Sequence, residues 1–323
     1  MKRVFVALVG IVLVLLPHHP RAWGFFGHRT INRLAVYTLP PGMIGFYKAN
    51  IDYLTENATR PDSRRTVVAG EAPRHFIDLD VYGDSAAYKM PRNYTDAVAR
   101  YGEDTLQRHG IVPWHVIVMK NRLTEAFRQR DADRILAVSA DMGHYVADAC
   151  VPLHTTHNYN GQLTGQRGIH GLWESRLPEL LASGYDFFTG PAPYIERPVP
   201  TIWGIVTRSN AAVDSVLRFE REVTTKFPED KKYTFEQRGN QTVRAYSREF
   251  SREYHQRLNG QVERQMRLAV RMVGAFWYTC WVDAGQPDLS KLTVASETEK
   301  KRLARESEEL QVAPQANAPG HTD

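Results

Sequence analysis

The spacing of the apolar residues most constrains the fold, because they recur at helical intervals through most of the chain. This spacing covers residues 30–38, 43–54, 94–109, 114–129, 132–149, 171–183, 205–224, 241–258 and 260–282. Strand-like alternation is almost absent, and residues 184–204, rich in glycine, proline and aromatic residues, are expected to form a long loop. We therefore expect an all-α fold, with one multi-helix domain over residues 23–290.

The amino-terminal segment has the order of a secretory signal peptide. Two basic residues at positions 2 and 3 precede the uncharged, apolar residues 4–16, and a short polar stretch then ends at Ala22. As a helix, this apolar run would span only ~20 Å of a ~30 Å hydrocarbon layer, which argues against a membrane anchor. We expect residues 1–22 to be removed between Ala22 and Trp23. The mature protein would then be secreted or periplasmic, with no transmembrane span.

The net charge and the small number of cysteines exclude several kinds of site. The formal net charge is +5, and three basic residues of the expected signal peptide reduce it to about +2, too little to indicate a nucleic-acid partner by itself. Two cysteines, Cys150 and Cys280, exclude a disulfide-rich scaffold and a zinc site built from four cysteines. Residues 291–323 become polar and are expected to form a disordered tail.

Histidines and carboxylates occur at spacings that metal sites use. His144 and Asp148 stand at positions i and i+4 of a helical pattern, so their side chains share one face. His154 follows just past a proline that should end that helix, and His170 and Glu174 repeat the i, i+4 spacing. Each pair alone is typical of a surface ion pair. Together they supply five nitrogen and oxygen ligands, more than one tetrahedral zinc needs, which indicates a cluster of two or more metals.

Two upstream segments complete a pattern that resembles a known family. Asp62 follows an Arg-Pro pair, and His75 opens the string His75-Phe-x-Asp78. With a mature amino-terminal Trp23, this ordered set resembles the zinc-dependent phospholipase C and single-strand-specific zinc nuclease superfamily, and it is closer to the phospholipases. The resemblance runs in order from Trp23 to about Glu174, and more loosely through the later helices.

The resemblance implies an all-α fold that holds three zinc ions in a cleft, and it implies the ligands of each ion. The first zinc would take Asp62, His75, His144 and Asp148; the second His154, His170 and Glu174; the third the free amine and carbonyl of Trp23, with His28 and a bridging Asp148. An α-amine, whose pKa is ~7.7–8.0, becomes a neutral nitrogen donor when a cation competes with its proton. Removal of the signal peptide would therefore complete the third site.

The implied activity is hydrolysis of a phosphodiester by a zinc-activated hydroxide. Clustered zinc ions lower the pKa of a shared water towards ~7 and neutralise the charge that develops on the phosphoryl oxygens, so no nucleophilic serine or cysteine is needed. The resemblance makes Asp62, which would orient the attacking water, and the bridging Asp148 the catalytic residues. His115 and His157 lie near the motifs but fit no ligand position, and we expect them beside the site or at the surface.

Three functions remain open. Glu174 as the last ligand and the Arg-Pro pair before Asp62 favour a phospholipase C that acts on a phospholipid headgroup, with transient contact at a membrane surface. The short spacing from Trp23 to His28 and the Leu-Trp pair before Glu174 favour a single-strand-specific endonuclease of the 3′-nucleotidase/nuclease type, which would act on single-stranded nucleic acid. The third alternative is a non-catalytic secreted zinc-binding protein. Structural zincs are closed by protein ligands, whereas the second site has only three side-chain ligands and needs a water, which favours catalysis.

Overall fold

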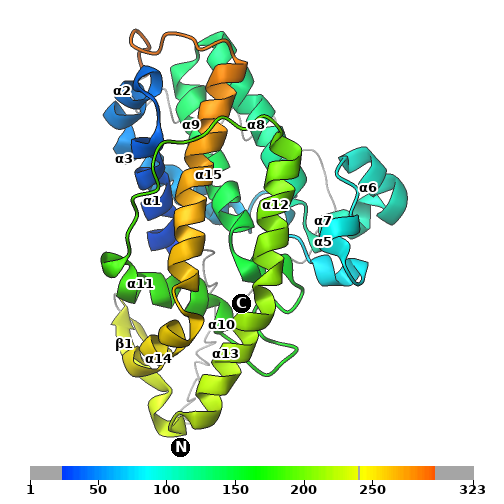
Figure 1. Ribbon diagram of the computed structural model, residues 1–323, viewed down its shortest axis with the longest axis vertical. Helices are drawn as coiled ribbons and strands as arrows, with labels where there is room; N and C mark the ends of the chain where they lie inside the picture. The colour runs from blue at the N-terminus through cyan, green and yellow to red at the C-terminus, as the bar shows by residue number, and fades with distance from the viewer. Residues whose placement is uncertain (1–23, 239–240, 295–323) are drawn as a thin grey trace, which may run out of the picture.

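The computed structural model describes residues 24–238 and 241–294, and most of them are helical (Figure 1). The α-helices are α1 (Gly24–Ala35), α2 (Pro41–Ala49), α3 (Ile51–Glu56), α4 (Arg60–Arg64), α5 (Ala86–Lys89), α6 (Tyr94–Tyr101), α7 (Glu103–His109), α8 (Val112–Gln129), α9 (Ala132–Ala149), α10 (Ile169–Gly171), α11 (Leu177–Leu181), α12 (Pro198–Ala211), α13 (Val213–Lys226), α14 (Arg248–Leu258) and α15 (Gln261–Asp283). The expected all-α class is confirmed.

Short helices of other types and one hairpin complete the described fold. The 3₁₀ helices are η1 (Val36–Thr38), η2 (Asn57–Thr59), η3 (Ala72–His75), η4 (Leu79–Tyr82), η5 (Pro152–Thr155), η7 (Ala182–Gly184) and η8 (Glu229–Lys231), and η6 (Leu172–Arg176) is a π-helix. The strands β1 (Tyr233–Arg238) and β2 (Gln241–Tyr246) pair antiparallel, with Tyr233 opposite Tyr246.

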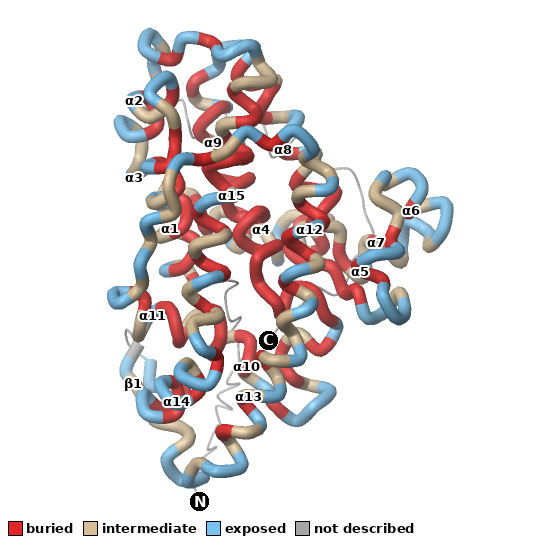
Figure 2. Tube along the Cα trace, viewed as in Figure 1, coloured by how far each residue is buried: buried red, intermediate tan, exposed pale blue. Residues whose placement is uncertain are grey.

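Helix α9 lies at the centre of the helical body. It packs against α8, α15 and α1, and Figure 2 shows that many residues in this region are buried. Every residue from Ser139 to the end of α9 is buried. Any polar side chain on this half of α9 must therefore find its partners inside the protein. The interpretation of His144 and Asp148 as a surface ion pair is excluded by this burial.

A close approach brings α1 against α9. A Cβ atom at Gly143 would lie 2.1 Å from Oδ1 of Asn32 on α1, so only glycine fits there. The Asn32 amide donates to the carbonyl of Ala140 at 3.1 Å and to that of Leu54 at 3.3 Å. His28 stands one turn before Asn32 on α1, so this contact places it beside α9.

The hairpin corrects the predicted helix over residues 241–258. Its first part is strand β2, and the helix starts after Ser247, whose hydroxyl accepts a hydrogen bond from the N–H of Phe250 at 3.2 Å. The strands are rich in β-branched and aromatic residues, but most of β2 is exposed or half-buried. Without a buried face, the strand period leaves little apolar alternation in the sequence.

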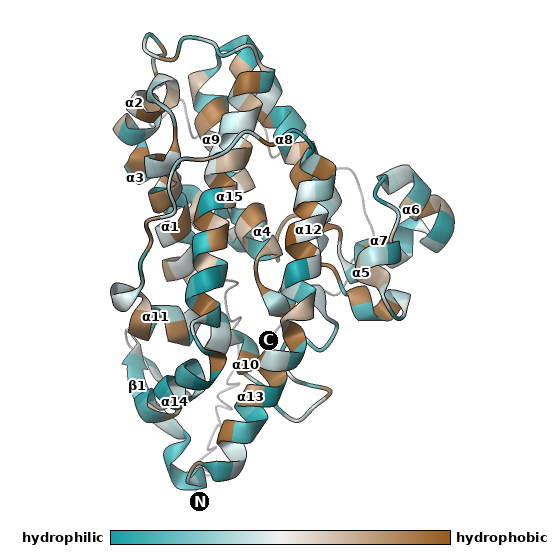
Figure 3. Ribbon diagram, in the orientation of Figure 1, coloured by the Kyte–Doolittle hydropathy of each residue, from teal (hydrophilic) through white to brown (hydrophobic). Residues whose placement is uncertain are grey.

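Other predicted boundaries were wrong by part of a helix. The pattern at 94–109 divides into α6 and α7 at Gly102, whose φ of 81° lies in the left-handed region. The pattern at 205–224 divides between α12 and α13, and the expected loop ends at Arg197, because α12 begins at Pro198. By contrast, the pattern at 132–149 matches α9, and Figure 3 shows apolar residues along that helix while α14 is mostly hydrophilic.

The remaining expectations concern the ends and the cysteines. The expected signal peptide, Trp23 and the tail beyond residue 294 lie outside the described residues. Among residues 24–238 and 241–294, no helix combines the length and the apolar character needed to cross a membrane. Cys150 and Cys280 are both buried and both free thiols.

Candidate metal centre

The structure brings together all eight of the expected ligand residues that it describes. They come from α1, α4, α9, α10 and the short helices η3, η5 and η6, and they are His28, Asp62, His75, His144, Asp148, His154, His170 and Glu174. Three groups among them have ligand atoms within 4.8 Å of one another. These groups are His28 with His144 and Asp148, Asp62 with His75 and His144, and His154 with His170 and Glu174. We call the eight residues the cluster.

Asp148 lies at the middle of the cluster. Its Oδ2 is 3.0 Å from Nδ1 of His75 and 3.2 Å from Nε2 of His144. Its Oδ1 faces a different pair, 3.4 Å from Nε2 of His28 and 3.6 Å from Nδ1 of His154. Since Nδ1 of His154 is hydrogen-bonded to a backbone carbonyl, Oδ2 faces the metal-facing nitrogens of His75 and His144, and Oδ1 faces that of His28. This is the arrangement that a bridging ligand requires.

Asp62 closes the first group from the opposite side. Pro61 stands in the first turn of the short helix α4, and the Asp62 side chain, 5% exposed, turns inward. Its Oδ1 lies 3.7 Å from Nδ1 of His75 and 3.6 Å from Nε2 of His144. Two carboxylates and two imidazoles therefore converge, as the resemblance implies for the first zinc.

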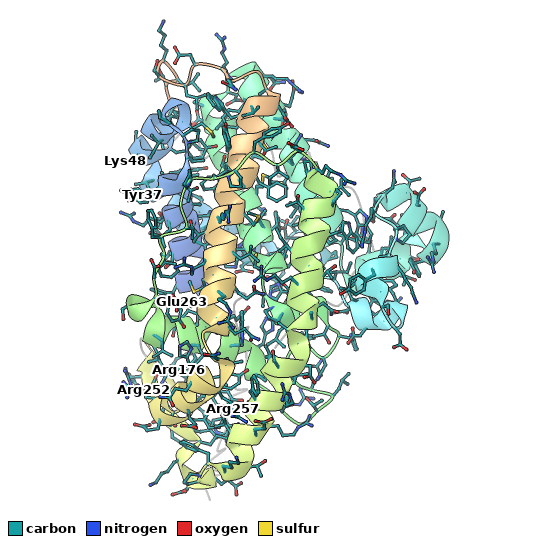
Figure 4. The ribbon with its side chains drawn as sticks, in the orientation of Figure 1. Tyr37, Lys48, Arg176, Arg252, Arg257 and Glu263 are labelled. Atoms are coloured by element: carbon teal, nitrogen blue, oxygen red, sulfur yellow. The ribbon has the colours of Figure 1, made fainter. Side chains whose placement is uncertain are left out.

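One ligand of the second group stands on a distorted helix. His154 Nε2 and His170 Nε2 lie 3.5 Å and 3.1 Å from Oε2 of Glu174. Glu174 belongs to the π-helix η6, a wide turn of the kind often found at functional sites. Arg176, two residues further on and labelled in Figure 4, pairs with Glu236 of β1 at 2.7 Å, so the hairpin is tied to η6.

Backbone carbonyls set the ring orientation of two histidines. Nδ1 of His144 donates to the carbonyl of Ala58 at 2.8 Å, and Nδ1 of His154 donates to the carbonyl of His75 at 2.7 Å. A histidine that donates from Nδ1 carries its lone pair on Nε2, which in both residues faces the cluster. Partners of this kind commonly orient metal-binding histidines.

Several cluster atoms are buried without a hydrogen bond. Among the described residues, these include both oxygens of Asp62, both oxygens of Glu174, Oδ1 of Asp148 and Nε2 of His154. Burying a carboxylate without partners costs several kcal/mol, and either protons on the neighbouring histidines or a bound cation would offset that cost. Nitrogen and oxygen donors without sulfur, in groups of three or four, fit zinc.

The charges in the cluster oppose the effect of burial. Burial raises the pKa of Asp148, but His144 and His154 hold that pKa well below its usual value. Burial lowers the pKa of His144, yet Asp148 and Asp62 raise it to about 9. The pKa of Glu174 is about 2, because His170 and His154 outweigh its burial. These carboxylates favour positive charge, and a metal would replace the histidine protons that otherwise supply it.

A buried ionic network surrounds the first group, and sequence reasoning missed it. Glu71 is fully buried, accepts a hydrogen bond from the Tyr145 hydroxyl, and lies 3.6 Å from Nε2 of His75. Arg64 links Glu71 to Asp141, on the α9 turn before His144. The one available signal was the i, i+4 spacing of Glu71 and His75, which is common in helices without any metal.

Comparisons with known proteins identify structural likenesses alone. No family model matches the sequence, and no curated protein matches it significantly. Similar solved structures include the alpha-toxin of Clostridium perfringens from an avian strain, with a TM-score of 0.47 and 11% identity over 82% of this chain and 64% of that chain. The alpha toxin of Clostridium absonum has a TM-score of 0.46 and 10% identity over 84% of this chain and 66% of that chain. This chain thus spans just under two thirds of the length of each.

Proposed function

We propose that this protein is a secreted zinc-dependent phosphodiesterase of the phospholipase C type, with three zinc ions in the cluster. The observation that carries the proposal is the position of Asp148, whose Oδ2 faces His75 and His144 while its Oδ1 faces His28. A closed structural site needs no such bridge between ligand groups. The ordered ligand set and its burial support the same assignment.

The residues of the cluster would have different roles in the reaction. Zinc ions bound here would lower the pKa of a bound water and neutralise the charge of a phosphodiester oxygen. Asp62 has both oxygens without hydrogen-bond partners among the described residues, so it can orient that water and accept its proton. Asp148 would bridge two of the zinc ions, the one beside His75 and His144 and the one beside His28. His154, His170 and Glu174 provide three ligands, which leaves a position for substrate.

The third zinc would depend on the new amino terminus. Helix α1 starts at the buried Gly24, where a Cβ atom would lie 2.7 Å from Oγ of Ser175. Ser175 is the neighbour of Glu174, so the first described residue of the chain lies beside the cluster. This position supports a role for the free amine of Trp23, together with His28 and Asp148.

Parallel assays test the activity and its substrate class. Protein that begins at Trp23 would be incubated with phosphatidylcholine vesicles and with single-stranded DNA, each with and without a chelator. We expect chelator-sensitive hydrolysis of phosphatidylcholine. Chelator-sensitive cleavage of DNA alone would establish the nuclease instead. Full zinc content without hydrolysis of either substrate would establish the non-catalytic zinc-binding alternative.

Adding one alanine before Trp23 tests the amino terminus. The extended protein has an amide nitrogen in place of the amine, and its planar peptide offers no lone pair to zinc. We expect it to lose one zinc ion per chain and most of its hydrolytic rate, while its fold persists. Equal zinc content and equal rates with and without the alanine would contradict a role for Trp23.

A further inference from the structure

Asp78, His109 and His157 converge outside the cluster, and we call them the Asp78 group. Nδ1 of His109 lies 3.1 Å from Oδ2 of Asp78, and Nδ1 of His157 lies 3.3 Å from the same oxygen. One ligand atom from each residue lies within 4.8 Å of the other two. Two imidazoles and a carboxylate thus meet at a place where the resemblance implies no metal.

Two paired segments connect the Asp78 group to the cluster. The N–H of Ile77 donates to the carbonyl of His154 at 2.8 Å, and the His154 side chain donates to the carbonyl of His75 at 2.7 Å. Residues 75–78 and 154–157 therefore run side by side. Each begins with a cluster histidine and ends with a member of the Asp78 group. Three residues span at most about 11 Å, so the two sets of ligands are close neighbours.

The backbone of His109 is fixed against the first segment. The N–H of Asp78 donates to the carbonyl of His109 at 2.7 Å. Gly110 has a φ of 89°, and a Cβ atom there would lie 2.2 Å from the carbonyl oxygen of Phe76. Only glycine permits this approach, which positions the preceding histidine beside Asp78.

The backbone of His157 is held on both sides. Its N–H donates to Oδ1 of Asp80 at 2.9 Å, and its carbonyl accepts from the amide of Gln162 at 2.6 Å. The hydroxyl of Thr156 donates to the other oxygen of Asp80 at 2.7 Å. The His157 side chain is 51% exposed, so an ion from solvent can reach it. Because its backbone is already held by these hydrogen bonds, ion binding does not have to order it.

We propose that Asp78, His109 and His157 bind a further zinc ion, separate from the cluster. Ligand atoms around a tetrahedral zinc stand about 3.3–3.6 Å apart, since each lies ~2.0–2.2 Å from the metal. The nitrogen–oxygen separations of 3.1 Å and 3.3 Å are close to that spacing. The Asp78 side chain, 2% exposed, gives the site a buried negative charge. Three protein ligands leave a fourth position open to solvent.

Counting zinc tests this site without reference to activity. Wild-type protein, the His109→Ala/His157→Ala double variant and a His255→Ala control would be equilibrated with free Zn²⁺ by dialysis, and zinc per chain measured by elemental analysis. His255 is a half-buried histidine that stacks on Tyr185, outside every metal group of the described residues. We expect the double variant to hold one zinc fewer than the wild type, and the control to match the wild type.

Repeating the count on an Asp148→Asn background separates this proposal from the proposed function. Even if the cluster binds no zinc at all, Asp148→Asn protein with His109 and His157 intact should hold one zinc more than Asp148→Asn protein that also carries His109→Ala and His157→Ala. Asp78→Asn should remove the same ion while both imidazoles remain. Equal zinc counts in the wild type and the double variant would overturn the proposal, and the group would then be a hydrogen-bonded triad.

Discussion

The cluster and the Asp78 group use the same ligand chemistry in opposite environments. In the cluster, the side chains of His144, His75 and Asp148 are 0% exposed, whereas in the Asp78 group His109 is 16% and His157 51% exposed. Water can solvate the exposed imidazoles when no metal is bound, but it cannot reach those of the cluster. Burial of the imidazoles therefore distinguishes the two sites. In the cluster only histidine protons or a bound metal can balance the carboxylates, whereas in the Asp78 group water also reaches the ligands.

The largest expected effect comes from Asp148→Asn. An amide cannot bridge two cations, so zinc content and phosphodiester hydrolysis should fall together, the hydrolytic rate by more than about a hundredfold, because even outer partners of metal ligands are worth 10–100-fold. Elemental analysis and kinetics on the same preparation check this. Glu174→Asp keeps a carboxylate and should retain a good part of both. An Asp148→Asn protein with full zinc would refute the bridge.

Asp141→Asn should produce the largest loss of stability. Asp141 is buried on α9 and pairs with Arg60 at 2.9 Å and Arg64 at 3.1 Å. Removing one partner of such a buried ion pair costs ~3–5 kcal/mol of unfolding free energy. Denaturant unfolding at pH 7 measures the loss. A change below about 0.5 kcal/mol, typical of surface sites, would show that the network does not stabilise this half of α9.

The same variant carries a pH signature. Burial raises the pKa of Asp141, but Arg60 and Arg64 lower it by more than burial raises it. The folded-state pKa therefore lies below the unfolded value. Its stabilising contribution is therefore present above the unfolded pKa of ~3.9 and is lost as pH falls through the folded pKa. The unfolding free energies of wild type and variant should converge as the pH drops below about 4. A constant difference between them down to the acid limit would contradict this origin.

Glu71→Gln should weaken zinc binding without removing a ligand. Glu71 faces Nε2 of His75 at 3.6 Å, so its charge supports the imidazole whose other nitrogen points at Asp148. Loss of an outer partner of this kind costs 10–100-fold in metal affinity, or about 1.4–2.8 kcal/mol. Competition with a zinc indicator measures it, and Glu263→Gln, on α15, serves as the control. An unchanged zinc affinity would show that Glu71 acts only in the ionic network with Arg64 and Asp141 and does not support the metal site.

His157→Ala should give the smallest effect on stability. Its side chain is half exposed, so in metal-free buffer the unfolding free energy should change by no more than about 0.5 kcal/mol. In excess zinc, the wild type should gain stability over the variant, because an ion that binds only the folded state stabilises it. If excess zinc stabilised the wild type and the variant equally, the stabilising ion would not be bound by His157.

Sequence reasoning reached the cluster because its ligands occur at helical spacing on α9 and in motifs that keep their order along the chain. It could not reach Glu71 or the Asp78 group. His109 and His157 are 48 positions apart in the chain and meet only because Gly110 lets the segment after α7 pack against Phe76. The hairpin was missed for a related reason, since an exposed strand has no apolar period to read.

Anomalous X-ray scattering at the zinc edge, from crystals of protein that begins at Trp23, would show whether Asp148 bridges two zinc ions. We expect zinc peaks within about 2.5 Å of both oxygens of Asp148, and another between His154 and Glu174. Crystals grown with zinc in which no anomalous peak lies near the Asp148 carboxylate would contradict it.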